Sequence, residues 1–165
     1  MSNYRRSWSK VGKRTIIDNQ QEYINRYLYS AIDPIDGDSF HMYKMPDVNT
    51  LTTKTFLNEL KEVYKDYYLI IVWDNASFHK SKQLEDKDLT IIFLPSYSPQ
   101  LNPVERFYGE MRKVTANRTF ENIEVQEKLI DEALVDWMKN KEKIKKLCGY
   151  DWIIESWNSM FDCKK

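Results

Sequence analysis

Cysteine is scarce in this sequence, and long apolar runs are missing from it. Cys148 and Cys163 are the only cysteines among 165 residues, and they form neither a C-x-x-C pair nor a set with metal-ligand spacing. Reduced thiols are therefore expected, as in cytosolic proteins. No run approaches the ~18 apolar residues of a membrane span, and the N-terminus has no apolar stretch typical of a signal peptide. These absences predict a soluble cytoplasmic protein that does not enter a membrane.

An excess of either charge is also lacking, because 25 basic and 25 acidic residues give a formal net charge of zero at pH 7. Charge is nevertheless uneven, since residues 1–14 form a basic arm without an acid, containing Arg5, Arg6, Lys10, Lys13 and Arg14. A solvated terminus is the simplest interpretation of this arm, and contact with an anionic partner is the alternative. The 42% hydrophobic content suffices for one core, so we assign residues 1–165 to a single domain.

The apolar patterning predicts an α/β fold. Residues 22–32 and 39–45 have the composition of two antiparallel strands, joined by the turn DPIDGD. Residues 52–67 carry apolar side chains at helical spacing. Two shorter runs, YYLIIVW (67–73) and LTIIFL (89–94), are rich in β-branched and aromatic residues, which favours strands. The first run is so apolar that we expect it to be buried and parallel to its neighbour.

Two further helices are predicted beyond these strands. The first begins near Asn102, and its inward side chains should be Phe107, Tyr108 and Met111. The second covers residues 123–140, where the apolar stripe consists of Leu129, Ile130, Ala133, Leu134, Trp137 and Met138. A stripe of this kind belongs to a core far more often than to a cofactor site.

Two acids, Asp74 and Glu105, stand where predicted regular elements meet loops. Asp74 follows the run YYLIIVW, and in open α/β sheets ligands bind outside the carboxyl ends of the strands. Each acid also has a purely structural interpretation. Asp74 and Asn75 can close the strand as an Asx turn. Asn102 at N-cap, Pro103 at N1 and Glu105 at N3 fit a capping box, in which the glutamate only returns a hydrogen bond to the cap backbone.

The stretch from Leu69 to Lys113 carries two longer motifs, DNASFHKS after the first of the short strands and LPSYSPQLNPVERFYGEMRK after the second. Together they resemble the catalytic core of DDE-superfamily transposases of the mariner-type insertion-sequence branch. There, one strand leads to D-N-x-x-x-H and the next to L-P-x-Y-S-P-x-L-N-P-[IV]-E. Nearly every position matches over about 45 residues. The 30 residues between Asp74 and Glu105 are slightly fewer than is usual in that branch, and the loop KSKQLEDKD accounts for the difference.

The resemblance implies a ribonuclease H-like fold, a mixed sheet flanked by helices, with Asp74 and Glu105 as the second and third acids of a catalytic triad. Transposases of this class hydrolyse a DNA phosphodiester and join the freed 3′-hydroxyl to a new strand. Two divalent ions, Mg²⁺ or Mn²⁺, are implied, because hard oxygen ligands suit them. Asp74 would bridge both ions, and Glu105 would hold one of them.

Supporting roles around the two acids also follow from the resemblance. We expect Asn75, His79 and Asn102 to hold the metal ligands in place, and the alternative for His79 is an ordinary hydrogen-bonding role. DNA contacts are expected from basic residues, namely Arg5, Arg6, Lys10, Lys13, Arg14, Lys80, Lys82, Arg112 and Lys113.

The first acid of the triad falls outside the matching motifs. In the family it lies on the first strand, shortly before a W-x-x-x-G-x-R segment, which here is WSKVGKR (Trp8–Arg14) with only MSNYRRS before it. We therefore expect the first strand and its aspartate to be missing. Asp33, Asp36 and Asp38 fit an ordinary hairpin turn, and Asp18 follows the basic segment instead of preceding it. The exposed strand edge that results favours a homodimer.

Two functions remain open from the sequence. The first is a transposase catalytic domain, completed by an acid from an upstream segment, another reading frame or another chain. The second is an inactive remnant that binds DNA or a protein partner through the retained scaffold. An unrelated ribonuclease H-like nuclease is a weaker third interpretation. Because the first acid is expected to be missing, little or no DNA cleavage is predicted for the chain alone.

Overall fold

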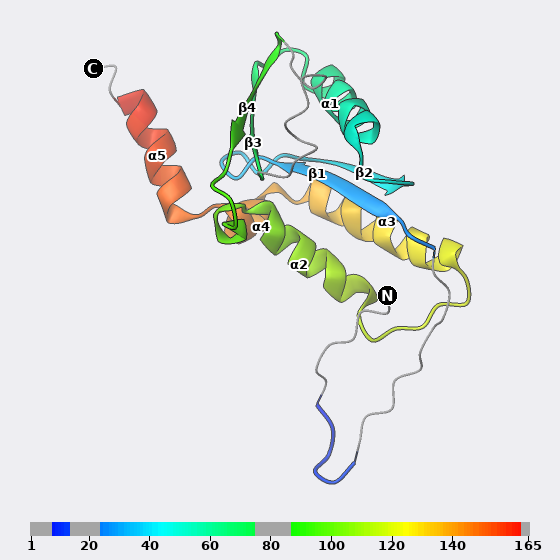
Figure 1. Ribbon diagram of the computed structural model, residues 1–165. Helices are drawn as coiled ribbons and strands as arrows, with labels where there is room; N and C mark the ends of the chain where they lie inside the picture. Colours follow the sequence, from blue (N-terminus) through cyan, green and yellow to red (C-terminus); the bar gives the residue numbers. More distant parts are fainter. Residues whose placement is uncertain (1–7, 14–23, 75–86, 163–165) are drawn as a thin grey trace.

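The computed structural model describes residues 8–13, 24–74 and 87–162 of the chain. Within these ranges four strands form two separate pairs, and helices lie on both sides of the first pair (Figure 1). The mixture of antiparallel and parallel strands with flanking helices confirms the predicted α/β class.

Strands β1 (Tyr27–Ile32) and β2 (Ser39–Met45) form the predicted antiparallel hairpin. β1 begins at Tyr27 and not at residue 22 as predicted, because residues 24–26 lie outside the hairpin ladder. Asp33 shapes the turn between the strands, since its Oδ1 accepts hydrogen bonds from the N–H groups of Ile35 (2.7 Å) and Asp36 (3.1 Å). Asp33 therefore has the structural role that the sequence indicated.

Strands β3 (Leu69–Trp73) and β4 (Leu89–Phe93) pair in parallel along their whole length, which confirms the predicted direction. The prediction that the first of these strands is buried is wrong for one of its faces. Ile70 and Val72 are 60% and 52% exposed, while the alternate side chains Leu69, Ile71 and Trp73 pack against the core. The described helix that contacts this pair covers one face only, so the other face meets solvent.

Helix α1 covers Thr50–Val63, whereas the sequence predicted 52–67. Its start is a capping box: the Asn49 side chain accepts from the Thr52 N–H (2.9 Å), and the Thr52 hydroxyl accepts from the Asn49 N–H (3.0 Å). Its end comes early because Tyr64 takes a non-helical conformation and the chain turns there. Tyr67, which the sequence assigned to the helix, lies beyond its end. Its ring meets the Tyr64 ring edge-on across the turn.

A first core joins the two strand pairs. Helix α1 supplies Phe56, Leu57 and Leu60, which pack against Tyr29 of β1 and Leu89 of β4. All five side chains are buried, and the Tyr29 and Phe56 rings stack with their centroids 5.3 Å apart. Because α1 contacts both pairs, it fixes the position of β3 relative to the hairpin.

A second core lies on the opposite face of the hairpin, against helices α2 (Val104–Thr115), α3 (Ile123–Lys139) and α4 (Lys141–Cys148). Its buried members are Phe107, Met111, Leu134, Trp137, Ile144 and Cys148. The inward packing predicted for α2 and α3 is thus confirmed, except that Met138 is 45% exposed. Burial raises the pKa of the Cys148 thiol to about 11, so this cysteine stays protonated.

His41 of β2 is enclosed by the second core. Its ring stacks on Phe107 with the centroids 4.7 Å apart, and its two nitrogens lie 2.9 Å from the Ser30 hydroxyl and 3.1 Å from the Ser39 hydroxyl. One nitrogen donates and the other accepts, which suits the neutral imidazole. Burial lowers the pKa of His41 from its ordinary value of 6.5 to about 4.

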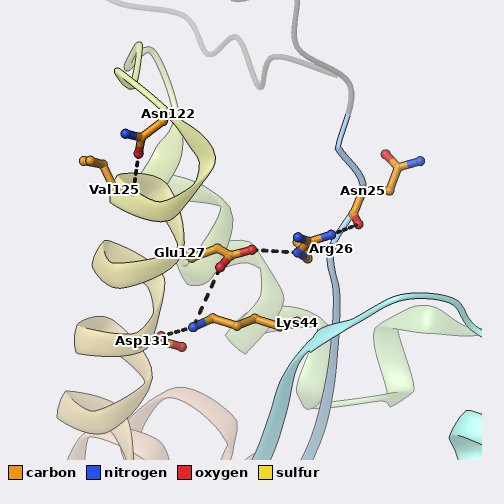
Figure 2. A network of polar contacts seen from close by, with 7 residues as sticks. All are labelled: Asn25, Arg26, Lys44, Asn122, Val125, Glu127 and Asp131. Atoms are coloured by element: carbon orange, nitrogen blue, oxygen red, sulfur yellow. Dashed lines mark hydrogen bonds and ion pairs between the residues drawn. The ribbon is translucent and has the colours of Figure 1, made fainter.

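A group of ion pairs attaches the hairpin to α3 (Figure 2). Lys44 of β2 has a φ of 65°, and the strand register shifts beside it, which is the geometry of a bulge. Its ammonium reaches Asp131 at 2.7 Å and Glu127 at 3.8 Å, while Arg26 reaches Glu127 at 2.6 Å. The bulge therefore directs a lysine from the hairpin toward the acidic side of α3.

Helix α5 (Asp151–Asp162) follows α4 and ends the described part of the chain, on the left in Figure 1. It exposes Trp152, Ile154 and Trp157 by 38–48%. None of the helices in the described ranges combines the length and the apolar content needed to cross a membrane.

Candidate active site

Asp74 lies directly after β3, at the edge where both parallel strands end. The ladder continues past the strands, because the Leu94 N–H donates to the Trp73 carbonyl at 2.7 Å. This bond brings the chain after β4 alongside Asp74. The predicted position of Asp74 at a carboxyl end of a parallel strand is therefore correct, and this is the end at which open α/β sheets bind ligands.

Glu105 lies in the first turn of α2, and the alternative interpretation of it as part of a capping box does not hold. The Asn102 N–H, which the glutamate was expected to bind, donates instead to the Pro99 carbonyl at 3.0 Å. A short 3-10 helix, η3 (Pro99–Leu101), produces this bond and moves the N-cap of α2 to Pro103. Asn102 still accepts from the Val104 N–H through Oδ1 (3.2 Å). Glu105 is thus not used for capping, and its side chain is exposed.

Contacts with α4 and the residues after it hold the start of α2 in place. The buried Cys148 lies 3.5 Å from the Pro103 carbonyl, and the Arg106 guanidinium donates to the Leu147 carbonyl at 3.3 Å. The same guanidinium lies 4.2 Å from the centre of the Tyr150 ring, a cation–π distance. The backbone that carries Glu105 is therefore tied to the second core.

Both acids line the same pocket, which has a volume of about 360 Å³. It is lined by Asp74, residues 94–99, Asn102 and Glu105. The structure thus brings together three of the residues singled out in the sequence, from the end of β3 and the beginning of α2. None of these lining residues is lysine or arginine, so the pocket suits a cation bound by oxygen atoms better than a bare anion.

Tyr108, one turn after Glu105, links the acids to the hairpin. Its hydroxyl donates to the Leu28 carbonyl of β1 at 3.3 Å. Burial raises the pKa of Tyr108, hydrogen bonding with Ser30 opposes this, and the negative charges of Glu105 and Asp74 raise it further. The sequence placed Tyr108 in the core but did not indicate its polar contact.

Tyr97 is a pocket residue that the sequence reasoning missed. It lies between Pro95 and Pro99 with a φ of 59°, a left-handed conformation that costs an L-residue about 1–2 kcal/mol. Its side chain is 101% exposed. The available signal was the tyrosine of the motif L-P-x-Y-S-P, which lies in a loop between a strand and Glu105.

The remaining predicted site residues are divided between described and undescribed parts of the chain. Lys10 and Lys13 are exposed and do not line the pocket. Arg112 and Lys113 lie on the exposed face of α2, where Lys113 pairs with Glu110. The others lie outside the described residues, namely Asn75, His79, Lys80, Lys82, Arg5, Arg6 and Arg14.

The acids of the hairpin turn do not approach this pocket. Asp38 pairs with Lys141 at 2.6 Å, and Asp33 is engaged in the turn. Within the described ranges, no group of three or more histidine, cysteine, aspartate or glutamate side chains is arranged to hold a metal ion. The pocket therefore presents two of the three acids that the resemblance implies.

Comparison with known proteins gives a family match along most of the chain. The sequence pattern of the DDE superfamily endonucleases matches residues 1–126. The "Uncharacterized protein y4pE/y4sA" of Sinorhizobium fredii (strain NBRC 101917 / NGR234) is 30% identical over 99 residues, which cover 58% of this chain and 73% of that protein.

Solved structures show the same fold. A Mos1 transposase paired-end complex with left transposon end has a TM-score of 0.60 at 17% identity, covering 88% of this chain and 48% of that one. A Mos1 mariner paired end complex with Mn has a TM-score of 0.60 at 17% identity, covering 90% and 49%. This likeness confirms the predicted ribonuclease H-like fold. The chain spans about half the length of the Mos1 chains.

Proposed function

Because this chain belongs to the DDE superfamily endonucleases, we propose that it carries the metal-dependent centre of a DNA transposase, which cleaves a phosphodiester and transfers the freed strand. One observation supports this most directly. Asp74 and Glu105 come from different elements, yet both line one solvent-accessible pocket beside the ends of two parallel strands.

The donors in the pocket fit a hard divalent cation. Two carboxylates and the Asn102 amide oxygen are ligands of the type that Mg²⁺ and Mn²⁺ prefer. Asp74 and Glu105 would hold the ions. Bound ions of this kind activate the attacking oxygen and stabilise the leaving oxygen. The contacts of Pro103 and Arg106 with Cys148 and Leu147 would keep Glu105 at a fixed position during the reaction.

We also propose that a third carboxylate completes the site from outside the residues that the structure describes. Two acids give fewer ligands than a two-metal centre needs. Its source is an additional segment or a second copy of the chain. The second source agrees with the homodimer expected from the sequence. The alternative of an inactive remnant gains no support from the pocket, because Glu105 is not employed in capping.

Mn²⁺ binding tests the metal role without relying on catalysis. We expect Asp74→Asn and Glu105→Gln each to weaken Mn²⁺ binding at least about tenfold, because even residues that only support metal ligands contribute 10–100-fold. Isothermal titration with MnCl₂ measures this. Asp66→Asn is the matched control, an exposed aspartate at the opposite end of β3. Equal Mn²⁺ affinity in the native protein, the two pocket variants and the control would exclude this pocket as the metal site.

DNA binding is expected to be weak, sequence-independent and strongly dependent on salt. The described pocket has no cationic lining residue, so phosphate contacts must come from exposed lysines and arginines such as Lys10 and Lys13. If roughly three to five phosphates are contacted, affinity should fall about 40- to 500-fold between about 50 and 200 mM salt. Fluorescence anisotropy with two unrelated duplexes measures both properties.

The basic arm can be tested in the same assay. The double variant Lys10→Ala/Lys13→Ala should reduce the slope of log affinity against log salt, and Lys139→Ala at the end of α3 is the control. Tight binding to one sequence that is insensitive to salt would contradict the prediction and would indicate a dedicated recognition element.

A further inference from the structure

Exposed aromatic rings are common on proteins, so exposure alone does not single out Tyr97. Tyr97 differs from the other strongly exposed tyrosines by its position. Tyr67 and Tyr68 are 72% and 62% exposed and precede β3, whereas Tyr97 is 101% exposed and lines the pocket that holds Asp74 and Glu105. It is the one aromatic residue among the residues that line this pocket.

The backbone at Tyr97 adds a second observation. Three non-glycine residues of the described ranges have positive φ, and two of them have an evident reason. Lys44 gains its ion pairs with α3, and asparagine, present at position 117, tolerates this conformation well. Tyr97 takes the same unfavourable conformation although its side chain packs against none of the described residues. A strained backbone and a fully exposed ring thus coincide at this pocket, which points to a function for the residue.

The loop around Tyr97 is also stiff. Pro95 and Pro99 fix two of its φ angles, the η3 turn begins at Pro99, and the Ser98 hydroxyl donates to the Ser96 carbonyl at 3.3 Å. A backbone restrained in this way loses little further freedom when a ligand stacks on the ring that it carries. The pocket wall thus offers a flat, uncharged surface on a stiff backbone, next to the two acids proposed to bind metal.

A nucleobase is the ligand that such a surface fits within a DNA-processing site. Aromatic side chains stack on bases with little sequence preference, because every base has a π-face. A base inside a duplex has both faces covered, whereas the base at a strand end, a nick or a flipped position has one open. The phosphate attached to such a base would lie toward the carboxylates and their ions.

We propose that the Tyr97 ring stacks on the unpaired or terminal nucleobase next to the phosphodiester held at Asp74 and Glu105. The inference rests on the proposed function, and it adds the part of the substrate that this pocket recognises. Tyr97 positions the strand for cleavage and takes no part in bond making or breaking. The stack selects an open base face and not a particular base.

Binding of two DNA probes tests the stack independently of cleavage. The first is a 12-nucleotide duplex with a short single-stranded 3′ end, and the second is identical but abasic at the junction nucleotide, both in Ca²⁺ buffer. We expect Tyr97→Ala to weaken binding of the first probe about 5- to 150-fold, and Tyr97→Phe to keep it within about twofold. The abasic probe should bind the native protein and Tyr97→Ala equally.

Further variants separate stacking from folding. Tyr97→Gly relieves the backbone, so its melting temperature should not fall, yet it should lose affinity as Tyr97→Ala does. Tyr67→Ala removes an exposed tyrosine at the other end of β3 and should leave affinity unchanged. A second readout is 2-aminopurine at the junction, whose fluorescence should change on binding the native protein and not Tyr97→Gly.

Two results would overturn the inference: equal loss of affinity for the abasic and intact probes in Tyr97→Ala, or unchanged affinity of Tyr97→Gly for the intact probe. Neither result bears on the metal-dependent function, which Mn²⁺ titration decides. The opposite case is a chain that binds no Mn²⁺ while Tyr97→Ala weakens binding of the intact probe and not of the abasic one. That result would support the stacking surface and contradict the proposed metal-dependent function.

Discussion

Replacing Asp74 by asparagine is expected to lower Mn²⁺-dependent nicking of supercoiled plasmid by at least about a hundredfold, and Glu105→Gln is expected to have the same effect. Each substitution keeps the size of the side chain and removes its negative charge. The pocket has two carboxylates to hold the ions, so the loss of either leaves one. A hundredfold loss corresponds to about 2.7 kcal/mol of transition-state stabilisation, a modest share of what a metal site contributes.

Controls for this prediction follow from the exposure of both acids. Because neither side chain is buried, the melting temperatures of the variants should stay close to that of the native chain. Asp66→Asn should nick as the native protein does. We expect the absolute rate to be low, since the resemblance implies a third acid that the pocket does not contain. Fast nicking that both substitutions abolish would mean that another carboxylate, foremost Asp18, completes the site. Nicking that survives both substitutions would place the chemistry elsewhere.

Acidification is expected to destabilise the fold through His41, by about 3 kcal/mol in total. The pKa of His41 is about 4 in the folded protein and near its ordinary 6.5 in the unfolded chain. Between these values the unfolded chain binds the proton and the folded protein does not. The stabilisation is therefore fully present above pH 6.5, is lost as the pH falls toward 4, and changes no further below that.

His41→Gln isolates this contribution from that of the many carboxylates. Glutamine can still hydrogen-bond Ser30 and Ser39 but does not titrate. Urea unfolding at several pH values between 7.5 and 4 should show a smaller loss of unfolding free energy for the variant than for the native protein, by about 2–3 kcal/mol. The variant itself will be less stable at pH 7.5, because it loses the stack on Phe107. Parallel pH profiles would show that His41 does not titrate as its burial indicates.

The sequence by itself placed Asp74 correctly, for a local reason. Five consecutive apolar residues, Leu69–Trp73, favour a strand, and the first polar residue after them must lie where that strand ends. The hairpin of β1 and β2 was equally accessible, because its turn is closed by Asp33, a side chain that shapes backbone within three residues. The inward side chains of α2 and α3 followed from helical spacing.

Competition between hydrogen-bonding partners decided the role of Glu105. Asn102, Pro103 and Glu105 have the spacing of a capping box, and nothing in that spacing reveals that Pro99 offers its carbonyl to the same N–H group. The turn of η3 wins because Pro99 already has the φ that such a turn requires. Sequence patterns report which bonds a segment can make, whereas the choice between two possible bonds depends on the folded backbone.

Burial and proximity were decided by tertiary structure alone. The run around Ile70 and Val72 is apolar enough for a strand covered on both faces, but the described helices pack on only one. The low pKa of His41 and the presence of Tyr97 in the pocket likewise depend on contacts between residues far apart in the chain. Local patterns determined which elements form and where Asp74 stands, because they act over a few residues. Only the packing of α1 and α2 on the strands could bring Asp74, Tyr97 and Glu105 to one pocket.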